Sequence, residues 1–241
     1  VRHYVEEQSD LYALNDKSIR AICEDREDNL WVGTVHEGVY IFYKNTAEIN
    51  YFYPASKSQK VSQRLRSIVE DPEGIIWMGS ENGGLTRYDP STGEIKKISL
   101  PIKTENILAL KIEGAYLWVG SYSFTDPLIR LNRKTLSIEA FPDFSRCAYH
   151  IEKYAKDTLI LSSRNGISFI DLSSSKPREI FYPQLEKVRT GLIIPAPDSS
   201  VWTGGRNAAL FNFKNGKVRE ISEFFPEGTE HLDMISTPGV M

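Results

Sequence analysis

One short phrase recurs along this chain, and its spacing constrains the fold more than any other feature. The phrase is an acidic turn, an apolar residue, a tryptophan and a glycine, followed by a second turn and an apolar run, as in residues 25–43 and 71–88. Its central position falls at Trp31, Trp77, Trp118, Ile160 and Trp202, so the steps are 46, 41, 42 and 42 residues. A period near 40 residues with strand-forming content indicates a repeat architecture.

Each repeat divides into four short strand-forming runs. In the first repeat the runs are 19–23, 30–32, 39–43 and 49–53, and Gly, Asn and Asp stand between them. β-branched and aromatic runs separated by such residues indicate antiparallel strands joined by tight turns. Four such strands per repeat, with no sustained helical period, predict an all-β fold: a β-propeller of four-stranded antiparallel blades.

The repeats set the expected domain organisation of residues 1–241. We expect about five complete blades, at 18–54, 65–101, 107–142, 148–183 and 189–226. The two end segments, 1–5 and 231–236, each have the pattern of a single strand from a further blade. Because open sheet edges invite pairing, a closed ring needs a complete blade there. We therefore expect an incomplete propeller from a longer protein, with a compact five-bladed ring as the alternative.

The recurring phrase has a structural explanation. A tryptophan in the middle of a strand can fill the gap between adjacent blades, and the glycine after it allows the next blade to approach closely. We therefore assign the acidic, tryptophan and glycine positions of the phrase to architecture, not to chemistry: Asp25, Asp71, Trp31, Trp77, Trp118, Trp202, Gly33, Gly79, Gly120 and Gly204.

Composition excludes several classes of function. A net charge of −3 gives no electrostatic case for binding nucleic acid or an anionic membrane surface. The two cysteines, Cys23 and Cys147, lie in different repeats, and we expect both to be small buried residues. The histidines fit no zinc spacing and no catalytic phrase, and no phosphate or dinucleotide motif is present. We therefore expect no catalytic residues, no metal and no cofactor.

The first two repeats resemble those of a known family. Residues 18–101 contain Ile-Arg-x-Ile-x-Glu-Asp followed by Leu-Trp-Val-Gly-Thr, and then a second, fuller copy from Leu65. This pattern resembles the two-component regulator propeller repeat. The match weakens through the third to fifth repeats, and the fourth has lost its tryptophan.

The resemblance implies a function. Proteins of this kind are extracytoplasmic, periplasmic sensors of bacterial hybrid two-component systems, built from seven-bladed propellers. The resemblance implies that a membrane helix and a histidine kinase core lie in other parts of the full protein, outside the present chain. By resemblance, this segment would recognise a glycan fragment and relay that signal to the kinase. It would dimerise through the full receptor, touch the membrane only through missing parts, and make no nucleic-acid contact.

The loops between the repeated phrases supply the candidate ligand-binding residues. Loops that join the second and third strands of a blade, and loops between blades, line one face of a propeller. There, arginine forks can hold a carboxylate or sulfate, and aromatic rings can stack on a sugar. The candidates are Arg20, Arg66, Tyr122, Phe124, Tyr149, Arg164, Asn165, Arg206 and Asn207.

Two other classes of function stay open. A propeller enzyme, such as a lyase or a glycan hydrolase, needs convergent acid and base groups on the loop face. A protein-interaction propeller of the Trp-Asp type needs a protein partner instead of a saccharide.

Overall fold

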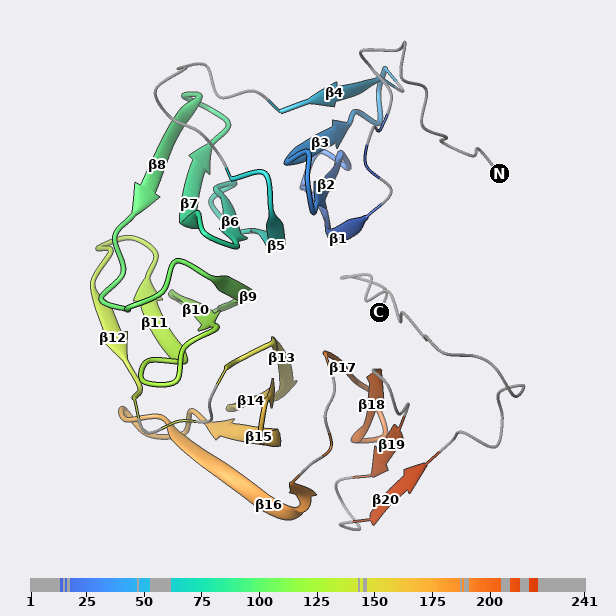
Figure 1. Ribbon diagram of the computed structural model, residues 1–241, viewed down its shortest axis with the longest axis vertical. Coiled ribbons are helices and arrows are strands. Elements are labelled where there is room, and N and C mark those ends of the chain that lie inside the picture. The colour runs from blue at the N-terminus through green and yellow to red at the C-terminus, as the bar shows by residue number, and fades with distance from the viewer. Residues whose placement is uncertain are drawn as a thin grey trace. The chain divides into compact units, whose positions relative to one another are not determined.

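The computed structural model describes residues 14, 16, 18–46, 48–52, 62–142, 144, 147–186, 188, 191–204, 209–212 and 217–220. These residues form twenty β-strands in five four-stranded sheets, and none of them is helical (Figure 1). The predicted fold class, a β-propeller of four-stranded antiparallel blades, is confirmed. The predicted end strands, 1–5 and 231–236, lie outside the described residues, as do Arg206 and Asn207.

The chain divides into two compact units, with the boundary between Ile112 and Glu113. In the first unit, one sheet has the order β1-β2-β3-β4 and the next has the order β5-β6-β7-β8. The strands of the first sheet are β1 (Ile19–Glu24), β2 (Leu30–Thr34), β3 (Val39–Phe42) and β4 (Ile49–Tyr51). Those of the second are β5 (Leu65–Glu70), β6 (Ile76–Ser80), β7 (Gly84–Asp89) and β8 (Glu94–Ile98).

The unit boundary falls at the end of β9 (Ile107–Glu113), which belongs to a third sheet of order β12-β11-β10-β9. The other strands of that sheet are β10 (Tyr116–Ser121), β11 (Leu128–Asn132) and β12 (Ile138–Ala140). The fourth sheet contains β13 (His150–Ala155), β14 (Thr158–Ser163), β15 (Gly166–Asp171) and β16 (Arg178–Glu186). The fifth contains β17 (Leu192–Pro195), β18 (Ser200–Gly204), β19 (Ala209–Asn212) and β20 (Lys217–Glu220).

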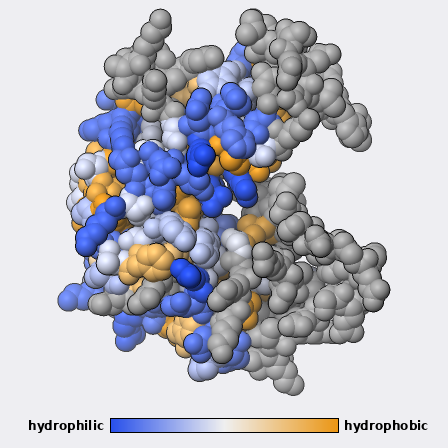
Figure 2. Space-filling model, in the orientation of Figure 1, coloured by the Kyte–Doolittle hydropathy of each residue, from blue (hydrophilic) through white to orange (hydrophobic). Residues whose placement is uncertain are grey.

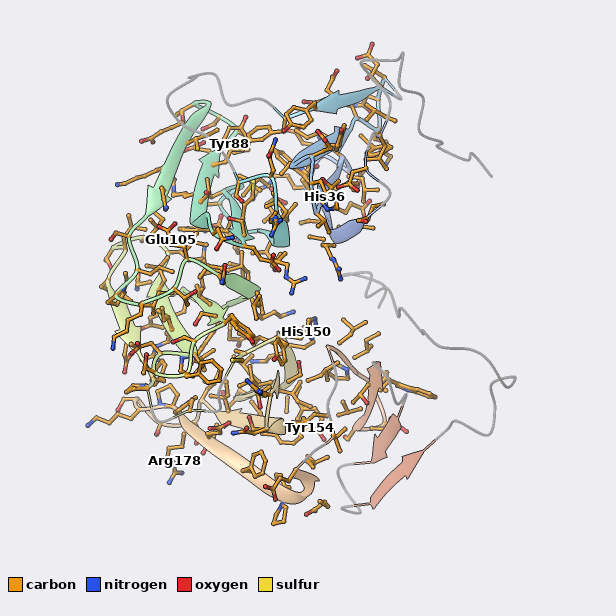
Figure 3. The ribbon with its side chains drawn as sticks, viewed as in Figure 1. His36, Tyr88, Glu105, His150, Tyr154 and Arg178 are labelled. Carbon is orange, nitrogen blue, oxygen red and sulfur yellow. The ribbon has the colours of Figure 1, made fainter. Side chains whose placement is uncertain are left out.

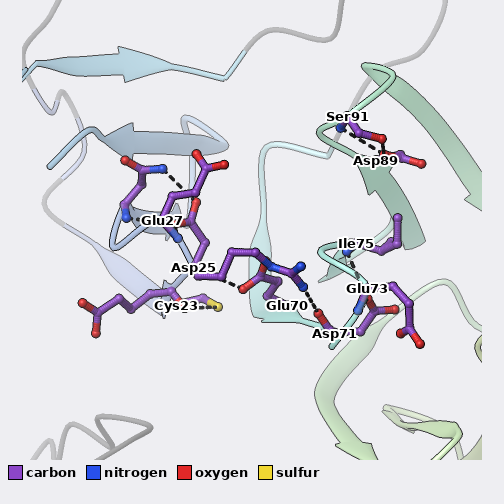
Figure 4. A network of polar contacts seen from close by, with 12 residues as sticks. Cys23, Asp25, Glu27, Glu70, Asp71, Glu73, Ile75, Asp89 and Ser91 are labelled. Atoms are coloured by element: carbon purple, nitrogen blue, oxygen red, sulfur yellow. Dashed lines mark hydrogen bonds and ion pairs between the residues drawn. The ribbon is translucent and has the colours of Figure 1, made fainter. Parts of the chain in front are cut away.

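The acidic residue of the phrase organises the turn before the second strand of the first two sheets. Asp25 Oδ1 accepts hydrogen bonds from the backbone N–H groups of Glu27 and Asn29, at 3.0 and 2.8 Å. Asp71 Oδ1 accepts the same two bonds, from Glu73 and Ile75, at 3.0 Å each (Figure 4). A carboxylate that satisfies its own turn in this way is an Asx motif, which favours the hairpin locally.

The other carboxylate oxygen fixes the tryptophan of the phrase. Trp31 Nε1 donates to Asp25 Oδ2 at 2.9 Å, and Trp77 Nε1 donates to Asp71 Oδ2 at 2.9 Å. Because a buried indole N–H needs a partner, this bond allows the whole ring to leave water. Asp25 and Asp71 therefore connect the turn to the core.

The turn before β18 places a different residue at this position. Ala196 N donates to Ser200 O, and Ser199 N donates to Ala196 O, which repeats the backbone pattern of the turns at Asp25 and Asp71. The backbone equivalent of the acidic residue is therefore Ala196, two positions before Asp198. The positive-φ residue of this turn, Ser199 (φ 69°), corresponds to Asp28 (φ 61°) and Gly74 (φ 87°) in the first two turns.

The tryptophans differ in burial. Trp31, Trp77 and Trp118 are at most 3% exposed, whereas Trp202, in the last described sheet, is 36% exposed. The Trp31 ring lies 5.3 Å from that of Phe52 and 5.9 Å from that of Tyr88, and Tyr88 belongs to the second sheet. In the first unit, the ring therefore fills the space between two blades.

Two glycines of the phrase lie against the first strand of the next blade. A Cβ at Gly33 would lie 2.8 Å from Leu65 Cβ, and a Cβ at Gly79 would lie 2.6 Å from Ile107 Cγ2. Both distances are shorter than normal carbon contacts, so a larger residue would push the blades apart. A polar contact adds to the first of these packings, since Arg26 bonds Glu70 Oε1 at 2.7 Å and the Asp71 carbonyl at 2.9 Å (Figure 4).

Candidate functional site

The loops that join the second and third strands are anchored by a buried hydroxyl. In each of four sheets the last residue of the second strand donates its hydroxyl to a carbonyl across the loop. The four bonds are Thr34 to Gly38 at 3.1 Å, Ser80 to Gly84 at 3.2 Å, Ser121 to Asp126 at 2.8 Å and Ser163 to Gly166 at 3.0 Å. All four hydroxyl residues are at most 2% exposed, so these loops begin from fixed points.

In the first unit the two candidate arginines have different surroundings. Arg20 is exposed on β1. Arg66, at the same position of β5, places its Nε 3.0 Å from Glu81 Oε1, and Arg64 lies 3.8 Å from the other oxygen of Glu81. Much of the charge of Arg66 is therefore balanced within the protein.

In the second unit, the loop between β10 and β11 is held by its own backbone and by the segment before β13. Ser123 Oγ accepts bonds from the N–H groups of Thr125 and Asp126, at 3.2 and 3.0 Å. Cys147 N donates to Ser123 O at 3.1 Å, and Ala148 N donates to Ser121 O at 3.2 Å. Residues 121–127 and 147–149 are thus joined into one surface.

Four of the predicted ligand-binding residues meet on this surface. We call Tyr122, Phe124, Tyr149 and Arg164 the aromatic–arginine cluster. The Tyr122 ring lies 6.0 Å from the Phe124 ring, nearly perpendicular to it, and 6.5 Å from the Tyr149 ring. The guanidinium carbon of Arg164 lies 5.6 Å from the centre of the Phe124 ring. Tyr122 is 42% exposed and Phe124 is 49% exposed, so these rings present apolar area to solvent.

The members of the cluster come from three segments of the chain. Tyr122 and Phe124 come from the β10–β11 loop, and Tyr149 directly precedes β13, where its N–H donates to Ser162 O at 2.9 Å. Arg164 lies in the tight turn between β14 and β15, next to Asn165, whose N–H donates to Ser163 Oγ at 3.1 Å. The remaining predicted pair, Arg206 and Asn207, lies outside the described residues.

The two described histidines are engaged in local structure (Figure 3). His36 donates its backbone N–H to Asp16 Oδ2 at 2.7 Å, and its ring Nδ1 lies 3.4 Å from the same oxygen. Burial raises the pKa of Asp16, but hydrogen bonds from Ser18 and His36 outweigh it, so the pKa lies below the ordinary value. His150 Nδ1 accepts a bond from Ile193 N at 3.3 Å. Each histidine therefore helps to hold a loop or strand in place.

Within the described part of the chain, no group of three metal-ligating side chains comes together, and no helix is long and apolar enough to cross a membrane. The face drawn in Figure 2 shows small hydrophobic areas separated by hydrophilic ones. A surface of this kind favours local binding spots over one broad apolar interface.

Comparison with known families identifies the repeat. Residues 13–36 and 60–82 match the family model described as two component regulator propeller. These two segments are two-component regulator propeller repeats. The resemblance read from the sequence is confirmed in the first two blades, where the phrase is most complete. A search of the curated proteins found no match.

Solved structures share the fold of this propeller. Two proteins described as extracellular domains of hybrid two component systems from B. thetaiotaomicron, BT3049 and BT4673, align with TM-scores of 0.70 and 0.64 at 18% identity. The alignments cover 86% and 78% of this chain, but 30% and 26% of those chains. Virginiamycin B lyase from Staphylococcus aureus aligns with a TM-score of 0.67 at 14% identity, over 87% of this chain and 71% of the lyase. The chain thus spans less than a third of these two extracellular domains.

Sequence reasoning missed two features of these propeller repeats. The hydroxyl that anchors each second-to-third-strand loop follows the phrase directly, as in Trp31-Val-Gly-Thr34, and its recurrence was a usable signal. The pairing of Arg66 with Glu81 had no such signal, because it depends on how the loop after β6 bends back.

Proposed function

We propose that this chain is part of the extracytoplasmic sensing domain of a bacterial hybrid two-component receptor. In this proposal it recognises a glycan fragment and relays binding to a histidine kinase elsewhere in the longer protein. The observation that carries it is the pair of two-component regulator propeller matches, at 13–36 and 60–82. The likeness to extracellular domains of hybrid two component systems supports the same reading.

The aromatic–arginine cluster is the proposed contact surface for the glycan. Exposed aromatic rings offer faces on which a sugar ring can stack, and burying them removes apolar area from water. The loop that carries Tyr122 and Phe124 is held by hydrogen bonds at both ends, so little loop entropy is lost when a ligand binds. We also propose that the receptor acts as a homodimer, and that only parts outside this chain meet the membrane.

The test uses the complete receptor in membranes. Kinase autophosphorylation is measured with and without a panel of oligosaccharides, and at least one saccharide should change the rate. Substituting Tyr122 and Phe124 together by alanine should abolish that response and leave the basal rate unchanged. If no saccharide changes the rate, or if a protein partner changes it instead, the glycan-sensing proposal is wrong.

A second candidate is a propeller lyase, because virginiamycin B lyase shares the fold over 71% of its length. The local roles of His36 and His150 do not favour it, since His36 lies against Asp16 and the Nδ1 of His150 accepts a backbone bond. Incubating the intact receptor domain with saccharides and with virginiamycin B separates the two candidates. A sensor leaves these compounds unchanged, whereas a lyase releases product.

A further inference from the structure

We propose that the aromatic–arginine cluster selects saccharides that carry a carboxylate or sulfate group, and that Arg164 binds this charged group. The inference rests on the proposed glycan-sensing function and narrows its ligand class. It depends on three features of the second unit: the surroundings of Arg164, the exposed rings beside it, and the anchoring of both.

Arg164 holds a positive charge at the surface that the described residues do not balance. It is exposed, and no described carboxylate forms an ion pair with it. Asp126, the acidic residue of the neighbouring loop, accepts the Thr125 hydroxyl at 2.8 Å. Glu186 is an exposed residue opposite Gly166 in the sheet and forms no ion pair with Arg164. An arginine that lacks an internal partner is available to an anion from solution.

Other arginines of the chain show what a structural arginine looks like here. Arg26 pairs with Glu70 at 2.7 Å, and Arg66 pairs with Glu81 at 3.0 Å. Arg178, which is also in the second unit and highly exposed, pairs with Asp171 at 3.3 Å. Each of these contacts uses guanidinium N–H donors on a carboxylate of the protein itself. Arg164 contacts an aromatic ring instead.

The contact with Phe124 leaves the donors of Arg164 unused. A guanidinium within about 6 Å of a ring centroid is attracted to the ring face without donating an N–H hydrogen bond. The guanidinium carbon of Arg164 meets this condition at 5.6 Å. The planar fork of five donors then remains free to hold a carboxylate or sulfate through two parallel bonds.

The aromatic rings explain why the anion should be attached to a sugar ring. Tyr122 and Phe124 are 42% and 49% exposed, and their rings lie edge to face, so each offers apolar area on which a sugar ring can stack. A sugar stacked on the Phe124 ring has its substituents close to Arg164, because the Arg164 guanidinium carbon lies 5.6 Å from the centre of that ring. A free inorganic anion would cover none of this apolar area. The geometry therefore favours an acidic saccharide over a simple ion.

The experiment measures affinity for matched ligands by isothermal titration of the complete extracytoplasmic domain. The probes are disaccharides in neutral, uronic-acid and 6-sulfated form, built on glucose and on galactose. Inorganic sulfate is a further probe. The variants are Arg164→Gln and Arg164→Lys. Arg178→Gln is the matched control, because it removes another exposed arginine from the same unit.

We expect a charged disaccharide to bind the unmodified domain about tenfold or more tightly than its neutral counterpart, as for a hydrogen-bonded charge pair. Arg164→Gln should remove that preference, so that charged and neutral disaccharides bind with similar affinity. Arg164→Lys should restore part of it, because lysine keeps the charge but lacks the fork. Arg178→Gln should change nothing. Comparing the affinities of the uronic-acid and 6-sulfated forms shows whether the carboxylate or the sulfate binds more tightly.

Four results overturn the inference. Equal affinity for neutral and charged disaccharides refutes charge selection, while glycan sensing stands if those ligands still activate the kinase. A charge preference that survives Arg164→Gln shows that another residue binds the charged group. Binding of inorganic sulfate as tight as that of the sulfated disaccharide removes the role of the rings. If no disaccharide binds and none activates the kinase, glycan sensing and the inference fail together.

Discussion

Replacing Asp71 by alanine removes one carboxylate that serves both a turn and the core. Asp71 is 4% exposed and accepts bonds from Glu73 N, Ile75 N and Trp77 Nε1. The Glu73 N–H can turn to water because that residue is exposed. The other two donors belong to Ile75, 8% exposed, and Trp77, fully buried, so both are left without a partner.

The expected cost follows from these two donors. A buried donor that loses a charged acceptor costs about 1.5–3 kcal/mol, so Asp71→Ala should destabilise the first unit by about 3–6 kcal/mol. With a urea dependence of about 2 kcal/mol per molar, the unfolding midpoint should fall by roughly 2 M. Asp71→Asn keeps an oxygen acceptor, and it should cost about half as much because the charge is lost.

The assay is urea unfolding of the intact chain followed by circular dichroism, with amide exchange at residues 75–77 as a local readout. Glu73→Ala is the control, because it alters an exposed residue of the same turn. It should shift the midpoint by less than about 0.5 M, as surface substitutions usually do. If Asp71→Ala shifts the midpoint no more than Glu73→Ala, the Asp–Trp bond is not what holds this hairpin.

Three further predictions concern packing, thiols and pH. Gly79→Ala puts a Cβ 2.6 Å from Ile107 Cγ2 and should cost about 1–3 kcal/mol by thermal unfolding, whereas Gly191→Ala, with no atom within 4 Å, should be neutral. Burial raises the pKa of Cys23 to about 11, so a thiol reagent at pH 8 should modify it only after unfolding. Hydrogen bonds from the serine two residues later lower the pKa of Asp89 below 3.8, so its contribution to stability is present above that pH and is lost as the pH falls through the lowered value. The stability difference between the natural chain and Asp89→Asn should therefore shrink between pH 7 and pH 3, and a constant difference would contradict the assignment.

The strand content of this fold could be predicted because it follows from period and composition. Strand-forming runs such as 65–69 and 75–78 are bounded by Asp, Gly and Asn, and these are strong local signals. The burial of Trp31, Trp77 and Trp118 follows from their place between apolar neighbours. The exposure of Trp202 does not, because burial depends on what packs against the sheet and not on the strand itself.

The sequence predicted which kinds of residue form the candidate site, but not which of them lie close together. Aromatic and arginine residues in loops are visible in the sequence, yet nothing there brings Tyr122, Phe124 and Arg164 together. Their proximity comes from tertiary packing between loops that are distant in the sequence, as in the bond from Cys147 N to Ser123 O, which joins residues 24 positions apart. The ion pair between Arg66 and Glu81 could not be predicted for the same reason. Arg66 therefore has a carboxylate partner, whereas no described carboxylate pairs with Arg164.

The central claim is that function lies in the loops of the second unit and that the recurring phrase is structural. Hydrogen–deuterium exchange of the complete extracytoplasmic domain, with and without an activating saccharide, tests this claim most directly. Protection should increase in residues 121–127, 147–149 and 163–166, while the strands that carry Trp31 and Trp77 remain unchanged. Protection confined to those strands, or absent from all three loop segments, would contradict the account.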